Sequence, residues 1–213
     1  LAETQRVLAA LPAPTIILAD GLAYGAMPAQ LISALRSPIV ALVHHPLCLE
    51  AGLAPARQDE LYALEKAALA LTRHIIVTSP STATTLINDF KVPADKITVA
   101  EPGTDPAQRA KGTGAPLQLL SVGSIVPRKA YDVLVRALAQ VTASDWRLTI
   151  VGHTDRSLEA VTALETAIRE TGQSGRITIA GAANTQQLDA HYAAADIFVL
   201  PSLYEGYGMV LAE

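Results

Sequence analysis

Short apolar runs alternate along this chain with longer segments whose apolar residues recur at helical spacing. The runs are rich in Val, Ile and Leu, and apolar and polar positions do not alternate strictly within them. Such runs are typical of parallel strands that are covered on both faces. They predict eight strands, at 15–20, 39–45, 74–79, 97–101, 117–123, 147–152, 176–181 and 197–202.

The segments between these strands predict helices and an α/β fold. Helices are expected near 28–36, 57–72, 81–90, 129–141, 157–171 and 185–195. Regular strand–helix alternation favours parallel sheets with helices on both faces. One turn-rich segment, 105–116, is weakly apolar and is the predicted linker. The expected domains are therefore 1–104 and 117–213, two similar units with a ligand cleft between them.

The last segment of the chain carries the most functional information. The run Ile197–Leu200 is a predicted buried strand that Pro201 ends. Gly206 and Gly208 then make a tight loop, and a helix can start at Met209. A strand, a glycine loop and a helix start form an anion cradle, because the first N–H groups of a helix lack intrahelical partners.

Two acids flank this cradle, Glu205 in the loop and Glu213 after seven further residues. Carboxylates accept hydrogen bonds from hydroxyl groups, as an acidic residue does for the ribose in dinucleotide folds. Backbone amides are then expected to bind a diphosphate and the acids to bind sugar or ribose hydroxyls. The spacing alone favours equally a second interpretation, in which both acids cap and solubilise a helix start.

A second candidate phosphate site opens the second unit. Gly123 and Ser124 end a predicted strand, and Arg128 and Lys129 stand at the following helix start. Arg binds a diphosphate with a forked guanidinium, and Lys binds it as a point charge. Such cations stabilise the negative charge that develops on a leaving diphosphate. The alternative is a solvated charge pair on a surface turn, which is common.

In the first unit, His44 and His45 follow a strand and precede Pro46. The carboxyl ends of parallel strands are where ligands collect. A shared metal ion is a poor interpretation, because adjacent residues on a strand point to opposite faces. A structural histidine at a strand end remains the alternative. Farther along, Ser79 or Ser81 is a candidate helix cap, and no Gly-x-Ser-x-Gly elbow supports a serine nucleophile.

Composition narrows the class of protein. Half of the residues are apolar, enough for a real core, and the net charge of −4 argues against a broad nucleic-acid surface. The single cysteine, Cys48, cannot form an intrachain disulfide, so a reducing cytoplasm is the expected compartment. No apolar run approaches the ~20 residues of a membrane span. Peripheral contact with the inner face of the membrane is left open.

The segment that ends the chain resembles the E-x7-E motif of retaining glycosyltransferases with the GT-B fold, in particular glycosyltransferase family 4, the group 1 transferases. The resemblance implies that Glu205 lies beside the donor hexose and that Glu213 binds the nucleotide ribose. It also implies that the backbone around the glycines contacts donor sugar and phosphate, at Gly206, Tyr207, Gly208 and Met209. Tyr207 stands where the family often has Phe.

The loop from Gly123 to Lys129 resembles the family loop in which a basic residue binds the donor diphosphate. This chain departs from it at Ser124, often Arg in relatives, and at Ala130, often Gly. The first departure leaves open whether Arg128 supplies the missing charge. His44, with His45 second, matches a family histidine that lies against the donor sugar.

The resemblance implies two Rossmann-like domains of the GT-B type, both incomplete in this chain. It implies transfer of a hexose-type sugar from a UDP-, GDP- or ADP-sugar to an unidentified glycan, lipid or small-molecule acceptor. Retention by a front-face route without a metal is expected, with the basic pair in place of the ion. The alternatives are a non-catalytic nucleotide-sugar module, a sugar-nucleotide epimerase relative and, less favoured, a glycoside hydrolase. The chain is expected to be a fragment with little turnover alone.

Overall fold

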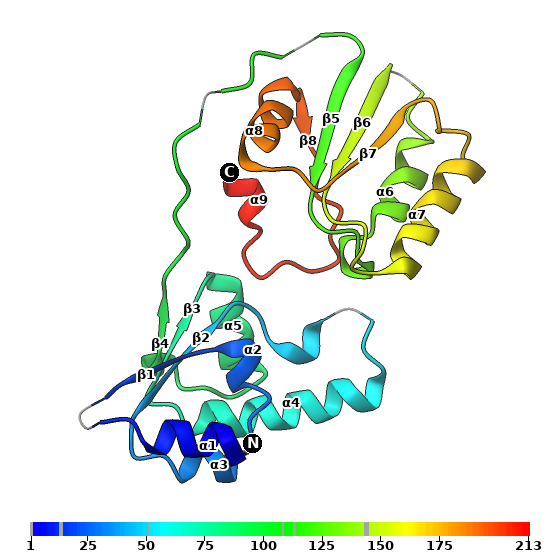
Figure 1. The fold of residues 1–213 in the computed structure, drawn as a ribbon. Coiled ribbons are helices and arrows are strands. Elements are labelled where there is room, and N and C mark those ends of the chain that lie inside the picture. Colours follow the sequence, from blue (N-terminus) through cyan, green and yellow to red (C-terminus); the bar gives the residue numbers. More distant parts are fainter. Residues whose placement is uncertain (1, 13–14, 51, 108, 113, 143–144) are drawn as a thin grey trace. The chain divides into compact units, whose positions relative to one another are not determined.

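The computed structural model describes residues 2–12, 15–50, 52–107, 109–112, 114–142 and 145–213 (Figure 1). The chain divides into two compact units. The first unit consists of Leu1–Gly103 with Glu205–Tyr207, and the second of Thr104–Tyr204 with Gly208–Glu213. Each unit contains a four-stranded sheet in which every strand pair is parallel. The predicted parallel α/β class is confirmed.

The sheet of the first unit has the order β1-β2-β3-β4. Its strands are β1 (Ile17–Asp20), β2 (Ile39–Val43), β3 (His74–Val77) and β4 (Ile97–Val99). The helices are α1 (Ala2–Ala9), α2 (Gly21–Tyr24), α3 (Ala29–Ser33), α4 (Pro55–Ala70) and α5 (Pro80–Asn88), with 3-10 turns η1 (Leu47–Leu49) and η2 (Ala94–Lys96). Because the strands are parallel and adjacent, their carboxyl ends lie along one edge of the sheet.

The core of the first unit joins the two central strands to helices α4 and α5. Val43, Ile75 and Val77 are almost fully buried, and Leu69 of α4 and Leu86 of α5 pack into the same cluster. Burying a side chain of this kind contributes roughly 1.5–3 kcal/mol. The carboxyl ends of β2 and β3 are therefore firmly fixed, and the loops that follow them start from rigid positions.

The sheet of the second unit has the order β7-β6-β5-β8. Its strands are β5 (Leu117–Val122), β6 (Trp146–Val151), β7 (Ile177–Gly181) and β8 (Ile197–Phe198). The helices are α6 (Tyr131–Leu138), α7 (Leu158–Glu170), α8 (Thr185–Ala194) and α9 (Met209–Ala212), with a 3-10 turn η3 (Pro127–Lys129). From β5 the chain adds β6 and β7 on one side and then returns to place β8 on the other. The strand order thus reverses between β5 and β8.

Both faces of the second sheet are covered. Helices α6 and α7 lie on one face and α8 on the other (Figure 1). Alternate residues of β5 follow this division, since Leu119 belongs to the cluster that includes α6 and α7, whereas Leu120 and Val122 pack with α8 residues. This arrangement explains why β5 carries apolar residues on both of its faces.

All eight predicted strands and all six predicted helices are present, with ends that differ by a few residues. Strand β2 ends at Val43, two residues early, because the chain bends at His44 and His45. Helices α1 and α2 and the turns η1 and η2 were not predicted, since segments this short show little periodicity. The described residues between Val99 and Leu117, where the predicted linker lies, form neither helix nor strand. Residues 108 and 113 of that linker lie outside the described ranges.

Candidate functional site

The second unit has a topological switch point between β5 and β8, where the strand order reverses. In open parallel sheets, ligands bind outside the carboxyl ends of the strands at such a point. The segments that follow these two strands are 123–130 and 199–208. They contain most of the residues that the sequence singles out.

The loop after β5 is tied to the neighbouring strand end. The Gly123 amide donates to the Val151 carbonyl at 2.8 Å, and the Tyr131 hydroxyl donates to the Gly123 carbonyl at 3.0 Å. Gly152 must lack a side chain, because a Cβ there would lie 1.9 Å from the Gly123 carbonyl oxygen. Ser124 follows, half-buried, and Ile125 donates its amide to the His153 carbonyl at 2.8 Å. These contacts fix the backbone of the loop.

The two cations of the loop have different surroundings. Lys129 is only 8% exposed. Its side chain lies against Gly123, where an added Cβ would come within 3.0 Å of Cε and 3.4 Å of Nζ. Arg128 is half-buried and donates from Nη1 to the Tyr204 carbonyl at 2.8 Å. The structure therefore brings Lys129 and Gly123 together.

Arg128 connects the two segments at the switch point. Besides its bond to Tyr204, its carbonyl accepts a hydrogen bond from the Leu203 amide at 2.9 Å. The segment after β8 is thus held against η3 by one bond in each direction. The stretch 202–204 directly precedes Glu205 in the sequence.

The backbone at Ala130 is unusual. This residue has φ 48 and ψ 41, in the left-handed region that favours glycine, and it stands between η3 and α6. A left-handed alanine costs about 1–2 kcal/mol. The position therefore suits the glycine that is common in the family.

The acidic motif is divided between the two units. Glu205, Gly206 and Tyr207 belong to the first unit, whereas Gly208, Met209 and Glu213 belong to the second. Gly208 has φ 81 and precedes α9, a position that requires glycine. The functional roles of these residues stay predictions.

Tyr192 is a residue of the site that the sequence did not indicate. Its hydroxyl lies 3.1 Å from the Val210 carbonyl and 3.2 Å from Glu213 Oε2, and its ring stacks on Phe198. Burial, followed by the charge of Glu213, raises the pKa of Tyr192, so the phenol stays protonated and can donate. Position 192 lies within a predicted helix, and nothing in its spacing distinguishes it from a core residue.

In the first unit, His44 lies at the carboxyl end of β2 beside the end of β1. Its Nε2 is 3.3 Å from Asp20 Oδ2, and both side chains are about half exposed. Asp20 Oδ1 accepts the Leu22 amide at 2.9 Å and so caps α2. The carboxylate, fixed by this cap, orients the imidazole.

The backbone around His44 is also held in place. Its carbonyl oxygen accepts hydrogen bonds from the hydroxyls of Thr78 (3.3 Å) and Thr82 (3.2 Å). Ser79 caps α5 by accepting the Thr82 amide at 3.0 Å, which confirms the predicted cap. His45 turns instead to Glu50, with 2.9 Å between Nε2 and Oε2. The two histidines therefore have separate acidic partners.

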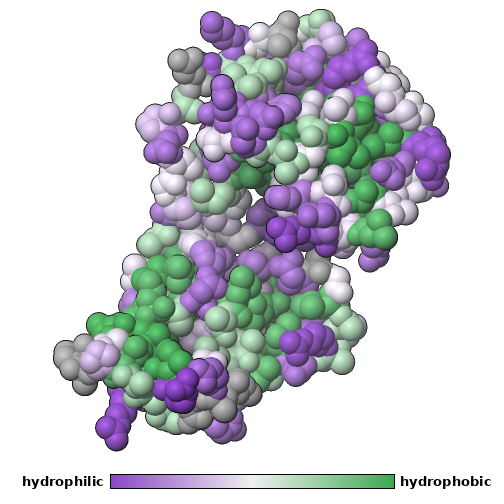
Figure 2. All heavy atoms as spheres, in the orientation of Figure 1, coloured by the Kyte–Doolittle hydropathy of each residue, from purple (hydrophilic) through white to green (hydrophobic). Residues whose placement is uncertain are grey.

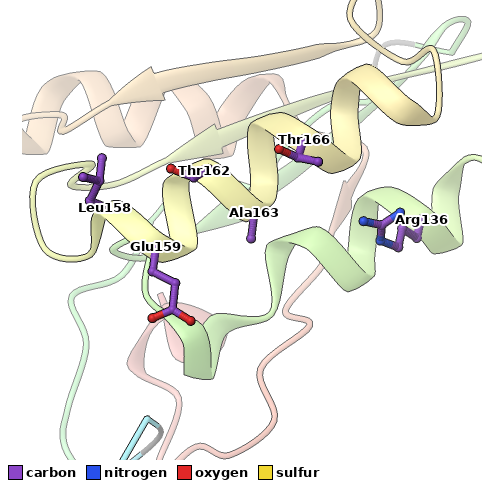
Figure 3. Close-up of a pocket in the computed structure, with 6 residues that line it drawn as sticks. All are labelled: Arg136, Leu158, Glu159, Thr162, Ala163 and Thr166. Atoms are coloured by element: carbon purple, nitrogen blue, oxygen red, sulfur yellow. The ribbon is translucent and has the colours of Figure 1, made fainter.

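One hollow of the second unit lies away from these loops. It measures about 560 Å³ and runs along helices α6 and α7 (Figure 3). The hollow is lined by apolar and polar side chains, those of Arg136, Leu158, Glu159, Thr162, Ala163 and Thr166. Figure 2 shows hydrophobic side chains gathered on this side of the unit, where Val133 and Leu158 are exposed. The hollow holds none of the predicted site residues.

No group of three or more His, Cys, Asp and Glu side chains among the described residues is placed to hold a metal ion. No helix among them has the length and apolar character needed to cross a bilayer.

Two family models together match nearly the whole chain. The model described as "Glycosyltransferase Family 4" matches residues 2–108, and the one described as "Glycosyl transferases group 1" matches residues 105–213. Each match covers about half of the chain, one per unit. The two parallel α/β units have the architecture of the GT-B fold. The chain belongs to the group 1 glycosyl transferases of family 4.

Curated relatives agree with this assignment. The D-inositol 3-phosphate glycosyltransferase of Nocardia farcinica is 32% identical over 166 residues, which cover 70% of this chain and 37% of that protein. The enzyme of the same name from Mycobacteroides abscessus is 36% identical over 128 residues, which cover 59% and 28%. The matched residues of this chain therefore span only 37% and 28% of the length of these two relatives.

Solved structures show the same fold. Sucrose-phosphate synthase from Thermosynechococcus elongatus has a TM-score of 0.76 and 23% identity, with 98% of this chain and 55% of that chain covered. Anabaena HepE in complex with UDP and glucose has a TM-score of 0.71 and 18% identity, with 98% and 58% covered. At such identities the likeness concerns the fold alone.

Proposed function

We propose that this protein is a retaining glycosyltransferase that moves a hexose-type sugar from a nucleotide diphosphate sugar to an acceptor. One observation carries the proposal: a nearly buried lysine amine lies against Gly123 at the switch point of the second sheet. A lysine amine binds phosphate as a point charge, and a glycine beside it lets the phosphate approach the backbone. A diphosphate bound at the carboxyl end of β5 would meet both the lysine charge and the open backbone at Gly123.

The proposed chemistry assigns a role to each charged group. The bond between the sugar C1 and the diphosphate oxygen breaks, and the acceptor oxygen bonds to C1 on the same face. The acceptor proton passes to the departing phosphate. Lys129 and Arg128 stabilise the charge that grows on the diphosphate, which lowers the barrier more than it stabilises the bound donor. Glu205 and Glu213 are proposed to bind hexose and ribose hydroxyls, and His44 to contact the sugar.

Two comparisons guide the choice of substrates. The Anabaena neighbour is solved with UDP and glucose and, in another crystal, with UDP-glucose, so UDP-sugars are the first donors to test. The curated relatives are named for D-inositol 3-phosphate, so a phosphorylated cyclitol is the first acceptor to test. The chain spans only part of these proteins, and both choices are proposals for the longest form that carries this sequence.

The binding step is tested by isothermal titration of UDP, GDP and ADP into that form. One diphosphate should bind, and Glu213→Ala and the double variant Arg128→Ala/Lys129→Ala should each weaken it by ~1–3 kcal/mol. Arg169→Ala removes a cation in the last turn of α7 and should leave binding unchanged. If a folded protein binds none of the three diphosphates, the proposal is wrong.

The transfer step needs its own experiment. Incubation with UDP-glucose and an inositol phosphate, with the anomeric proton coupling of the product read by NMR, distinguishes retention from inversion. Activity should persist in excess EDTA, because the basic pair takes the place of a divalent ion. Binding without transfer would favour a nucleotide-sugar binding module, and an epimerised donor would favour the epimerase alternative. Loss of activity in EDTA would contradict the metal-free route.

A further inference from the structure

Glu65 is a buried carboxylate to which the proposed chemistry gives no role. It lies on α4 and is only 1% exposed, although glutamate is almost never fully buried unless paired. Its Oε2 accepts the Leu47 amide at 2.8 Å. Its Oε1 has no hydrogen-bond partner among the residues that the structure describes. A buried carboxylate with one oxygen unsatisfied is costly, and in a native protein it points to a role.

The carboxylate lies between two elements that flank His44. One is η1, which begins at Leu47 after the three-residue loop 44–46. The other is α2, whose C-cap Gly25 would place a Cβ 3.1 Å from Glu65 Oε1. The same helix α2 is capped at its start by Asp20, the partner of His44. Glu65 thus lies at the end of helix α2, which begins after Asp20, and at the end of the loop that begins with His44.

We propose that Glu65 is a positioning residue: by holding the Leu47 amide, its carboxylate fixes the loop 44–46 and so orients His44 at the carboxyl end of β2. The loop is anchored at its start by Val43 in the sheet core and by the Thr78 and Thr82 hydroxyls on the His44 carbonyl, and at its end by the part-buried bond from Leu47 to Glu65. Without the acceptor, the half-buried amide of Leu47 would lose its side-chain partner, and the end of the loop would shift. The inference rests on the proposed role of His44 toward the donor sugar.

The surroundings of Glu65 support a carboxylate that titrates near neutrality. Burial raises the pKa of Glu65 to about 7, and the Leu47 hydrogen bond opposes this shift in part. Two neighbouring elements contribute titratable groups. Cys48 lies on η1, and burial, followed by the charge of Glu65, raises the pKa of its thiol. Tyr24 lies on α2, and its hydroxyl donates to the Ala68 carbonyl. Helix α3 brings no charged side chain. Ionised Glu65 accepts a stronger, charge-assisted bond from Leu47 than the protonated form does.

A direct test follows from the sequence around Leu47. Within the printed sequence, a Pro–Leu pair occurs only at 46–47 and 116–117. Protein labelled with carbonyl-¹³C proline and ¹⁵N leucine therefore gives one amide signal for Leu47 and one for Leu117. The Leu117 amide donates to a backbone carbonyl, that of Asp145, and is an internal control. Between pH 5 and 9 the Leu47 proton shift should change with a midpoint near 7 while Leu117 stays constant.

Two variants separate positioning from a merely structural role. Glu65→Gln keeps an acceptor for Leu47 but cannot ionise, so its Leu47 signal should be flat and its kcat within about twofold of the parent. Glu65→Leu removes the acceptor and should lower kcat at least tenfold, with affinity for the nucleoside diphosphate changed less than twofold. Because Glu65→Gln resembles the protonated form, the parent kcat should match that of Glu65→Gln below pH 7 and differ from it by at most about twofold above pH 7, an inflection that Glu65→Gln lacks.

The inference and the proposed function fail in different ways. A Leu47 signal that is the same in the parent and in Glu65→Leu across the pH range overturns the inference, and so does a folded Glu65→Leu protein with parental kcat. If the parent protein binds no diphosphate and transfers no sugar, the proposed function fails. The NMR titration then still decides whether Glu65 holds the loop.

Discussion

At the scale of single residues, Glu65 also makes stability depend on pH. Its pKa rises from an ordinary 4.5 to about 7 on folding, so the folded state binds protons more tightly than the unfolded state. The stability that Glu65 contributes is therefore fully present below pH 4.5 and is lost as pH rises through 7. A difference of this size corresponds to roughly 3 kcal/mol.

Glu65→Gln should remove this dependence. Urea unfolding at pH 5 and pH 8 measures it: the parent should lose up to ~3 kcal/mol between the two values relative to the variant. Glu60→Gln, on the exposed side of the same helix, is the control and should follow the parent. Equal losses in parent and Glu65→Gln would mean that Glu65 ionises normally.

At the scale of elements, the turn into α6 offers a prediction about strain. Ala130 is left-handed at the start of this helix, and Ala130→Gly should relieve about 1–2 kcal/mol of strain while adding ~0.5–1 kcal/mol of unfolded-state entropy. The free energy of unfolding should rise by up to ~1 kcal/mol. Ala137→Gly, exposed in the same helix, should lower it by ~0.5–1 kcal/mol. A decrease in both variants would show that Ala130 is not strained.

The elements also show what the sequence could and could not predict. Strand β5 was predictable because Leu117–Val122 is a short, nearly continuous apolar run, and such a run is typical of a parallel strand covered on both faces. The loop with Gly123 and Lys129 was identifiable as a candidate phosphate site because glycine and cations follow that strand, and its role stays a prediction. Glu65 was not, since a single glutamate within a helical segment does not reveal which face it occupies. Tyr192 was missed for the same reason: its partner Glu213 is distant in sequence and adjacent only in the fold.

At the scale of the whole molecule, two units with separate cores should unfold in separate steps. Trp146 is the only tryptophan and is buried in the second unit, so its fluorescence reports on that unit, whereas circular dichroism reports on both. Leu69→Ala and Leu164→Ala empty comparable buried sites in the first and second units and should each cost ~2–5 kcal/mol. Only Leu164→Ala should shift the fluorescence transition. Equal shifts from both variants would indicate one cooperative unit.

The two contacts of Asp20 limit the substitutions that position 20 can accept during evolution. One carboxylate caps α2 with one oxygen and faces His44 with the other. Substitution by Asn retains the cap but withdraws the charge, and substitution by Ser retains only the cap. No neutral residue can both cap α2 and place a negative charge beside His44. Selection for the histidine partner and selection for the helix cap therefore act on the same codon, which makes position 20 pleiotropic.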